Sequence, residues 1–221
     1  CVANNTMPYS DYRECRALDL TVEIFHNNGT FQEITKFLSH RGIKGSEFIQ
    51  KIHSMVYKGN TSISHFYDDY AKEEEKNSWK SSKELRAFIE KPGVAEKYFS
   101  GEYGMNEIYK YRALAFFHNL DVLHEIACNV ARSILETKGC LDEKTEIYLD
   151  EVTQFSLLRK RSLFETDLDF CQKFYFDFEQ LTKINFSIDP FQLIRPQAFK
   201  TKIFHSPEQK HVLKSYIDQY G

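Results

Sequence analysis

The sequence predicts a mainly α-helical domain of orthogonal, bundle-like packing, with one long central helix and a small β-hairpin near the C-terminus. Three observations lead to this prediction. Apolar residues recur at helical spacing over most of the chain up to Arg161. The longest such run extends from Asn106 to Gly139 and contains no proline. After Phe164 the pattern changes to alternating aromatic residues, which is typical of a strand.

The first helix is expected to begin at Ser10 or Asp11 and to end near Asn27, where Asn-Asn-Gly provides a stop signal. The sequence T-F-Q-E from Thr30 to Glu33 matches a capping box and predicts a second helix that ends near Gly42. Further helices are expected to begin at Ser46, at Thr61 or Ser62, at Ser81 or Ser82 (ending at Ile89), at Asn106 and near Asp142.

The C-terminal part predicts a strand pair. In QKFYFDFEQ three phenylalanines alternate with Tyr175 and Asp177, which indicates a strand, and KTKIFHS is its expected partner. A terminal helix is expected from Ser206, with Pro207 at its first position. We expect one helical accessory domain over residues 1–221, with a subdivision into 1–104 and 105–221 as the alternative.

Composition excludes several classes of protein. The 29 basic and 32 acidic residues give a net charge of -3, so nothing indicates a nucleic-acid partner. No apolar run approaches the roughly 20 residues that span a bilayer. Five widely spaced cysteines, with no C-x-x-C pair, do not predict a zinc site or an iron–sulfur cluster. Scattered thiols favour a cytoplasmic protein, against four N-x-[ST] sequons. The start at Cys1 suggests a processed chain or a piece of a longer one.

Two E-x-x-H pairs and one D-x-x-H pair have the spacing of a helical di-metal site: Glu23/His26, Glu208/His211 and Asp121/His124. A helical wheel argues against a metal site on the first helix. It groups Leu18 and Val22 with the apolar arc and leaves a narrow polar arc. That polar arc is the candidate interface, and it consists of Arg16, Asp19, Glu23 and His26.

Three other patterns carry weaker signals. HEIAC, from His124 to Cys128, lacks the second histidine of a zinc peptidase. Cys15 and Cys128 lie in expected helix interiors, where a thiolate nucleophile is not favoured. The basic patch LLRKRS, residues 157–162, suits either a solvated helix end or an acidic or phosphate partner. From these residues the chain therefore has no predicted catalytic, cofactor-binding or metal-binding residue.

Two stretches resemble a known family. YRECRALDLTVEIFHNNGTFQEITKFLSHRGI is similar to the segment that follows the catalytic barrel in cobalamin-dependent radical S-adenosylmethionine (radical SAM) enzymes, which has the pattern C-R-x-L-x-L-x-V-E-I-F-x-N-x-x-x-F. IFHSPEQKHVLKSYIDQYG resembles the ending of the same proteins, and KFYFDFEQL is similar to one of their strands. The resemblance covers roughly a third of the chain and contains no catalytic motif.

The resemblance implies a non-catalytic C-terminal accessory domain that packs on a barrel and shapes access for a substrate or partner. The [4Fe–4S] cluster, S-adenosylmethionine and cobalamin would belong to the preceding domains of the parent enzyme, which would act by radical methyl transfer or a related rearrangement on a small molecule or a protein. Two alternatives remain from the residues: a free-standing helical protein-interaction module, and a helical di-metal carboxylate protein.

Overall fold

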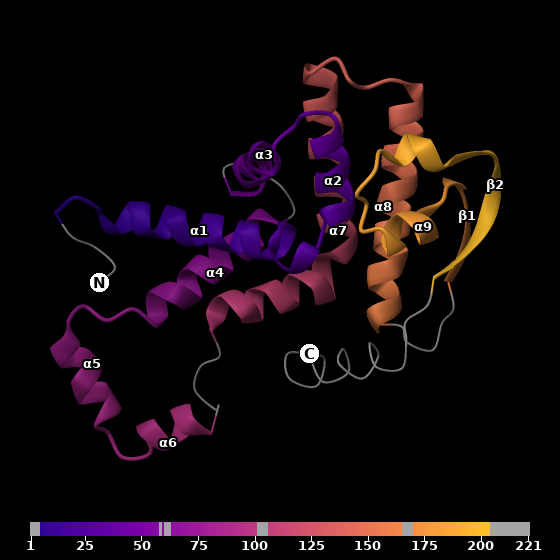
Figure 1. The fold of residues 1–221 in the computed structure, drawn as a ribbon. Coiled ribbons are helices and arrows are strands. Elements are labelled where there is room, and N and C mark those ends of the chain that lie inside the picture. The colour runs from indigo at the N-terminus through magenta and orange to yellow at the C-terminus, as the bar shows by residue number, and fades with distance from the viewer. Residues whose placement is uncertain (1–4, 58, 60–62, 101–105, 165–169, 204–221) are drawn as a thin grey trace.

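The computed structural model of this chain describes residues 5–57, 59, 63–100, 106–164 and 170–203 (Figure 1). Within these ranges it contains nine α-helices and a two-stranded antiparallel hairpin, which confirms the predicted fold class. The elements are α1 (Tyr9–Phe25), α2 (Gln32–His40), α3 (Gly45–Tyr57), α4 (Ser64–Lys76), α5 (Ser82–Ile89), α6 (Val94–Phe99), α7 (Glu107–Thr137), α8 (Glu143–Phe164), β1 (Phe170–Phe176), α9 (Phe178–Lys183) and β2 (Ile194–Ile203), with short 3-10 turns at Asn27–Gly29 and Pro190–Leu193.

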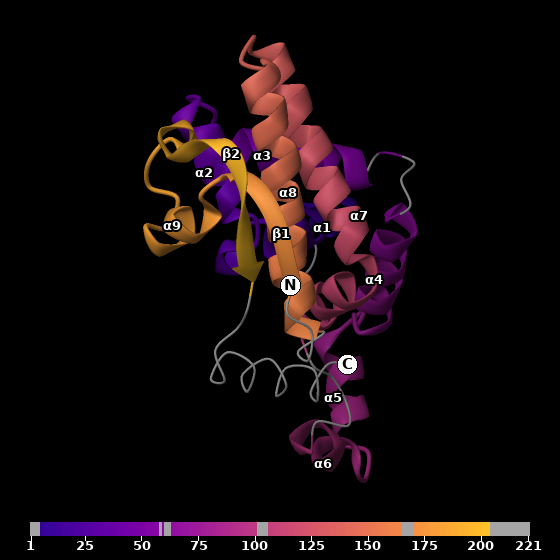
Figure 2. The ribbon, with the colours of Figure 1, turned by 90° about the vertical axis from the view of Figure 1, so that its right-hand side faces the viewer.

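Helix α7 is the centre of the fold, as expected. It packs against α1, α2, α3, α4 and α8. It is not straight, because Asn119 leaves the helical region with φ -127° and ψ 19°, and the two halves of α7 meet at a bend (Figure 1). Helix α8 runs beside the second half of α7, and the hairpin covers the far side of α8 (Figure 2). The boundary considered between residues 104 and 105 lies outside the described residues.

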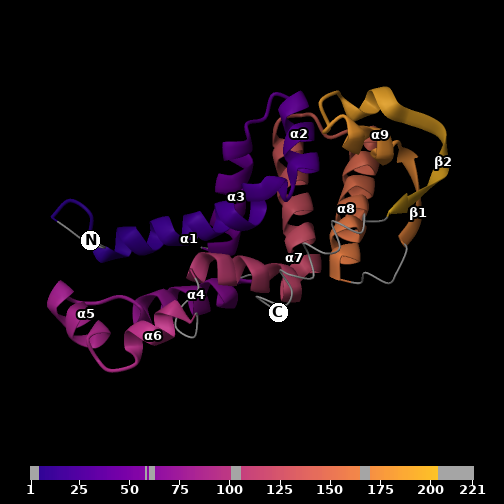
Figure 3. The same cartoon turned by 60° about the horizontal axis from the view of Figure 1, so that its bottom comes forward.

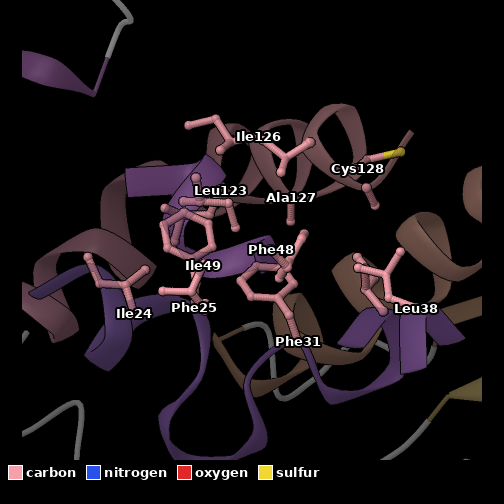
Figure 4. Packing of buried hydrophobic residues seen from close by; sticks show 14 of the residues in the cluster. Ile24, Phe25, Phe31, Leu38, Phe48, Ile49, Leu123, Ile126, Ala127 and Cys128 are labelled. Carbon is pink, nitrogen blue, oxygen red and sulfur yellow. The ribbon is translucent and has the colours of Figure 1, made fainter. Parts of the chain in front are cut away.

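The core lies where the second half of α7 meets α1, α2 and α3 (Figure 4). Ile24, Phe25 and Phe31 are fully buried there, as are Phe48 and Leu123. Each such side chain contributes about 1.5–3 kcal/mol relative to an exposed one. The apolar stripe of α1 therefore anchors it on α7.

The hairpin differs in one place from the prediction. Strand β1 ends at Phe176, and Asp177 caps α9 by accepting a 3.0 Å hydrogen bond from the backbone N–H of Gln180. The predicted strand through Phe178 is therefore wrong at its end, because the capping carboxylate turns the chain into a helix. The phenylalanines still share one side, since Phe174, Phe176 and Phe178 are all fully buried.

The caps predicted at Ser81 and at Thr30 have different outcomes. The hydroxyl of Ser81 accepts a 3.2 Å hydrogen bond from the N–H of Glu84 and caps α5, as expected. Thr30 does not cap α2; its hydroxyl donates to the carbonyl of Asn27 at 2.9 Å, and Phe31 is the N-terminal boundary of that helix. Glu33 is thus not part of a capping box. The expected helix from Ser206 lies outside the described residues. None of the described helices has the length and apolar character needed to cross a membrane.

Candidate functional site on the first helix

Helix α1 buries one face and exposes another, but the division differs from the expected one. Glu23 is buried, with 8% of its surface exposed, although it was predicted on the outward polar arc. Leu18 is 37% exposed, although it was predicted on the buried arc, and Val22 is half-buried. The wheel placed the boundary between the faces wrongly because α4 and the first half of α7 also cover α1.

Arg16 ties α1 to α4. Its guanidinium donates to the carboxylate of Glu74 at 2.6 and 2.9 Å and to Asp19 at 2.9 Å. The hydroxyl of Tyr70 donates to the same Glu74 oxygen at 2.9 Å. The hydrogen bond to Glu74 raises the pKa of Arg16 above its usual value, so the guanidinium stays charged at any working pH. Burial, reinforced by Glu74, raises the pKa of Tyr70. Arg16 is therefore a structural cation.

Glu23 ties α1 to α7. Its carboxylate forms an ion pair with the guanidinium of Arg112, and the two side chains are only 10% and 13% exposed. The other carboxylate oxygen accepts from the side-chain amide of Asn27 at 2.5 Å, so the segment after α1 is held by the same group. Arg112 also lies over the ring of Tyr109, 5.3 Å from its centroid. The acid of the Glu23/His26 pair is thus bound to a cation within the chain.

The candidate interface is not one open set. Arg16 and Glu23 are engaged with neighbouring helices, whereas Asp19 has a 59% exposed side chain and His26 is exposed. At 100° per residue, Asp19 shares a strip of α1 with the exposed Cys15 and Leu18, and the exposed His26 follows directly after the helix. We call these four residues, Cys15, Leu18, Asp19 and His26, the outer face of α1. It offers an aliphatic side chain, a thiol, a carboxylate and an imidazole to a partner.

A second polar cluster, which sequence reasoning missed, lies between α2, α7 and α8. The ammonium of Lys160 donates to Glu33 at 2.7 Å and to the hydroxyl of Ser156 at 2.5 Å. Ser156 also contacts Nε2 of His124 at 3.0 Å, and Nδ1 of His124 lies 2.7 Å from the carbonyl of Leu120. Glu33 shares the buried face of α2 with Ile34 and Phe37. An acidic residue among the apolar residues of that face was the sequence feature that could have indicated a buried ion pair.

Burial and mutual attraction set the charges of this cluster. Burial alone would raise the pKa of Glu33, but the adjacent ammonium of Lys160 outweighs it and lowers that pKa. Burial lowers the pKa of Lys160, and burial together with Lys160 lowers the pKa of His124 to about 4. The cluster therefore joins the Glu33–Lys160 ion pair to an imidazole that is neutral at pH 7.

These contacts separate the acid from the histidine in the pairs that have metal-ligand spacing. Asp121 binds Arg161 at 2.5 Å on the surface while His124 points inward, so the D-x-x-H pair diverges. Glu208 and His211 lie outside the described residues. Across the part of the chain that is described, no three His, Cys, Asp or Glu side chains group closely enough to hold a metal ion. Lys160, in the basic patch at 157–162, does not extend into solvent but forms an ion pair with Glu33 of the same chain.

The cysteines of the described segments are separate from one another. Cys15 and Cys171 are exposed on α1 and β1, Cys128 is buried on α7, and Cys140 follows α7; all four are free thiols. These thiols do not form a set that fits an iron–sulfur cluster. The chain matches no protein-family model, no curated protein and no solved structure. The function of this chain must therefore be inferred from the residues of α1 and from the surfaces that the fold leaves open.

Proposed function

We propose that this chain is the non-catalytic C-terminal accessory domain of a cytoplasmic, cobalamin-dependent radical SAM enzyme, and that it packs on the catalytic barrel of the same polypeptide. The cluster, S-adenosylmethionine and cobalamin belong to the preceding domains. The parent reaction is a radical methyl transfer or a related rearrangement on a small molecule or a protein. The accessory domain contributes a rigid helical surface that shapes the access of the substrate or of a protein partner.

The proposal is supported by the pattern C-R-x-L-x-L-x-V-E-I-F-x-N-x-x-x-F, which runs from Cys15 to Phe31. Most of its side chains are buried in the core or hydrogen-bonded within the domain. Leu20, Ile24, Phe25 and Phe31 are fully buried. Arg16, Glu23 and Asn27 form the hydrogen bonds to Glu74, to Arg112 and between α1 and the turn that follows it. Such a motif specifies a scaffold.

Three positions that the pattern specifies are exposed, Cys15, Leu18 and Asn27, and of these Asn27 is the one bonded to Glu23. An exposed leucine alone needs no explanation. Its place in the same motif as the anchoring residues, beside Asp19 and His26, supports the outer face of α1 as the surface that contacts the barrel. An aliphatic centre with polar neighbours is the usual composition of a domain interface.

The gene upstream of Cys1 tests this proposal first. We expect a C-x-x-x-C-x-x-C motif within a few hundred codons before Cys1, preceded by a cobalamin-binding domain. A start codon immediately before Cys1 would overturn the proposal and leave the free-standing interaction module, which the exposed Leu18 equally favours.

The second test uses the full polypeptide, purified without oxygen. Leu18→Asp places a charge in the proposed interface, so we expect it to reduce formation of 5′-deoxyadenosine from S-adenosylmethionine while the helical content is unchanged. Ile147→Asp is the matched control, because Ile147 is a 38% exposed aliphatic residue on α8. Equal activities of the two variants would show that the outer face of α1 contacts nothing that matters to the reaction.

A further inference from the structure

The hairpin of β1 and β2 is strongly basic, although the chain as a whole is slightly acidic. Its two strands contain Lys173, Arg195, Lys200 and Lys202 and no acidic residue, in a chain with a net charge of -3. The hairpin lies on the side of α8 that faces away from α7, at one edge of the molecule (Figures 2 and 3). The fold thus concentrates positive charge at this edge.

The register of the hairpin places two of these lysines directly opposite each other. Lys173 and Lys200 are partners in the antiparallel ladder, and both are exposed. Directly opposed residues of a ladder point to the same face, with Cβ atoms about 4.5–5.5 Å apart. The next residues, Phe174 and Thr201, are buried on the other face. The two lysines therefore lie side by side on the outer face of the hairpin.

This pair of lysines contributes nothing to the stability of the sheet. Like charges directly opposite each other across a ladder are destabilising. Arg195 is compensated by Asp177, and Lys183 of α9 by Glu179. Among the residues that the structure describes, neither Lys173 nor Lys200 forms an ion pair. Two neighbouring cations without a structural role indicate an anionic ligand.

Tyr175 adds an aromatic ring to the same face. It follows Lys173 by two positions, and the alternation of exposed and buried side chains along β1 continues through it. Its side chain is 42% exposed. Its backbone N–H donates to the carboxylate of Glu151 at 2.8 and 2.9 Å, which holds this part of β1 on α8. An aromatic ring on a rigid strand beside two cations suits a ligand that carries both an anionic and an aromatic group.

We propose that the outer face of the hairpin binds an aromatic phosphomonoester, with its phosphate between Lys173 and Lys200 and its aromatic group on Tyr175. A phosphomonoester carries a charge of about -1.5 to -2 at pH 7 and three acceptor oxygens. One such group accepts hydrogen bonds from both ammoniums and compensates both charges. A carboxylate carries a single charge and would leave one lysine uncompensated.

The experiment is a titration of the protein with adenosine monophosphate at low ionic strength, followed by phosphorus NMR. We expect a saturable shift of the phosphate signal. Lys173→Gln and Lys200→Gln should each weaken binding about tenfold, because each removes a charge-assisted hydrogen bond. Tyr175→Ala should weaken it about fivefold or more through the loss of stacking. Lys183→Gln is the matched control, since it removes the same charge from α9, and it should change the affinity by less than about twofold.

Thermal unfolding without ligand provides a second measurement on the same variants. Lys200→Gln removes the repulsion between opposed ammoniums, so we expect its unfolding midpoint to rise while its affinity for the nucleotide falls. A lower midpoint would assign Lys200 to the stability of the fold and overturn the proposed site. Circular dichroism verifies that each variant remains helical.

Three further outcomes would overturn the proposed site. Equal losses of affinity in Lys173→Gln and Lys183→Gln would mean that the nucleotide responds only to net charge. Inorganic phosphate that binds as tightly as adenosine monophosphate would remove the role of Tyr175. A single-stranded oligonucleotide without a terminal phosphate that binds more tightly than the nucleotide would favour a nucleic-acid partner instead. None of these outcomes depends on the proposed function, because the site lies entirely on β1 and β2.

Discussion

Lys160 of α8 and Glu33 of α2 form a buried ion pair, with Nζ 2.7 Å from Oε1. Their side chains are only 15% and 4% exposed, and they lie 127 positions apart in the sequence. Each charge compensates the desolvation of the other, and Ser156 provides a further hydrogen bond to the ammonium. The pair therefore holds α2 against α8 only while both partners are present.

Removing one partner of this pair should be strongly destabilising. Glu33→Gln leaves the ammonium of Lys160 without its counter-charge, so we expect the free energy of unfolding to fall by about 3–5 kcal/mol. Lys160→Met should have a similar effect. The double variant Glu33→Leu/Lys160→Met removes both charges and should lose clearly less than the sum of the single variants. Urea denaturation followed by circular dichroism measures all three.

The control for these variants is an exposed ion pair. Lys138 and Glu47 lie 3.3 Å apart, with side chains 48% and 42% exposed. Glu47→Gln should cost less than about 1 kcal/mol, because solvent screens that pair. A loss for Glu33→Gln no larger than the loss for Glu47→Gln would contradict the role assigned to the buried pair.

His124 predicts how stability depends on pH. Burial, with Lys160 nearby, lowers its pKa from 6.5 to about 4 in the folded chain. Between these values the unfolded state binds a proton that the folded state does not, so stability decreases as the pH falls from 6.5 to 4. The shift corresponds to about 3 kcal/mol over that range. The lowered pKa of Glu33 adds a further loss below its ordinary value of 4.5.

Two histidine variants of α7 test this assignment. His124→Gln should flatten the decline of unfolding free energy between pH 6.5 and 4, whatever its effect at pH 7. His118 lies on the same helix and is exposed, so His118→Gln is the matched control for the loss of a histidine that is not buried. A slope that survives in His124→Gln would assign the acid sensitivity to another group.

Variants at Glu23 and Asp19 distinguish a structural side chain of α1 from a surface side chain of the same helix. Glu23→Gln should lower the free energy of unfolding by about 3 kcal/mol, because the largely buried Arg112 loses its counter-charge. Asp19→Asn should change it by less than about 0.5 kcal/mol, since that side chain is 59% exposed. Thermal and urea unfolding of both variants measure the difference. Similar losses at both positions would show that the outer face of α1 is also structural.

Most helices of this fold were predictable because each of them has its own local signal, whereas α6 and α9 were not predicted. The stripe of α1, the Ser81 cap of α5 and the uninterrupted run of α7 depend on residues within a few positions of one another. The bend at Asn119 was not predictable, since residues on both sides of it favour a continuous helix. It depends on how the two halves pack against different neighbours.

The polar contacts could not be predicted from spacing. The sequence around Glu33 matches a capping box, and the sequence around Lys160 is typical of a solvated helix end. Only the fold brings these two residues into contact. In the same way Glu23 was assigned to the outward arc, because nothing in α1 shows that Arg112 lies opposite. Of the predicted interface, Asp19 and His26 are on the surface, whereas Arg16 and Glu23 form bonds within the chain.

Gly42 provides the last prediction, which concerns the turn between α2 and α3. Its φ is +72°, and it ends α2 with the N–H of Ile43 bonded to the carbonyl of Leu38 at 3.0 Å. Gly42→Ala should lower the free energy of unfolding by about 1–2 kcal/mol, because a Cβ disfavours this left-handed conformation. Gly45 is the control: an added Cβ at either glycine meets no atom within 4 Å, but Gly45 has no positive φ. Gly45→Ala should be neutral or stabilise the chain by up to about 1 kcal/mol. Urea unfolding compares the two, and equal losses would mean that the backbone conformation at Gly42 is not what requires a glycine.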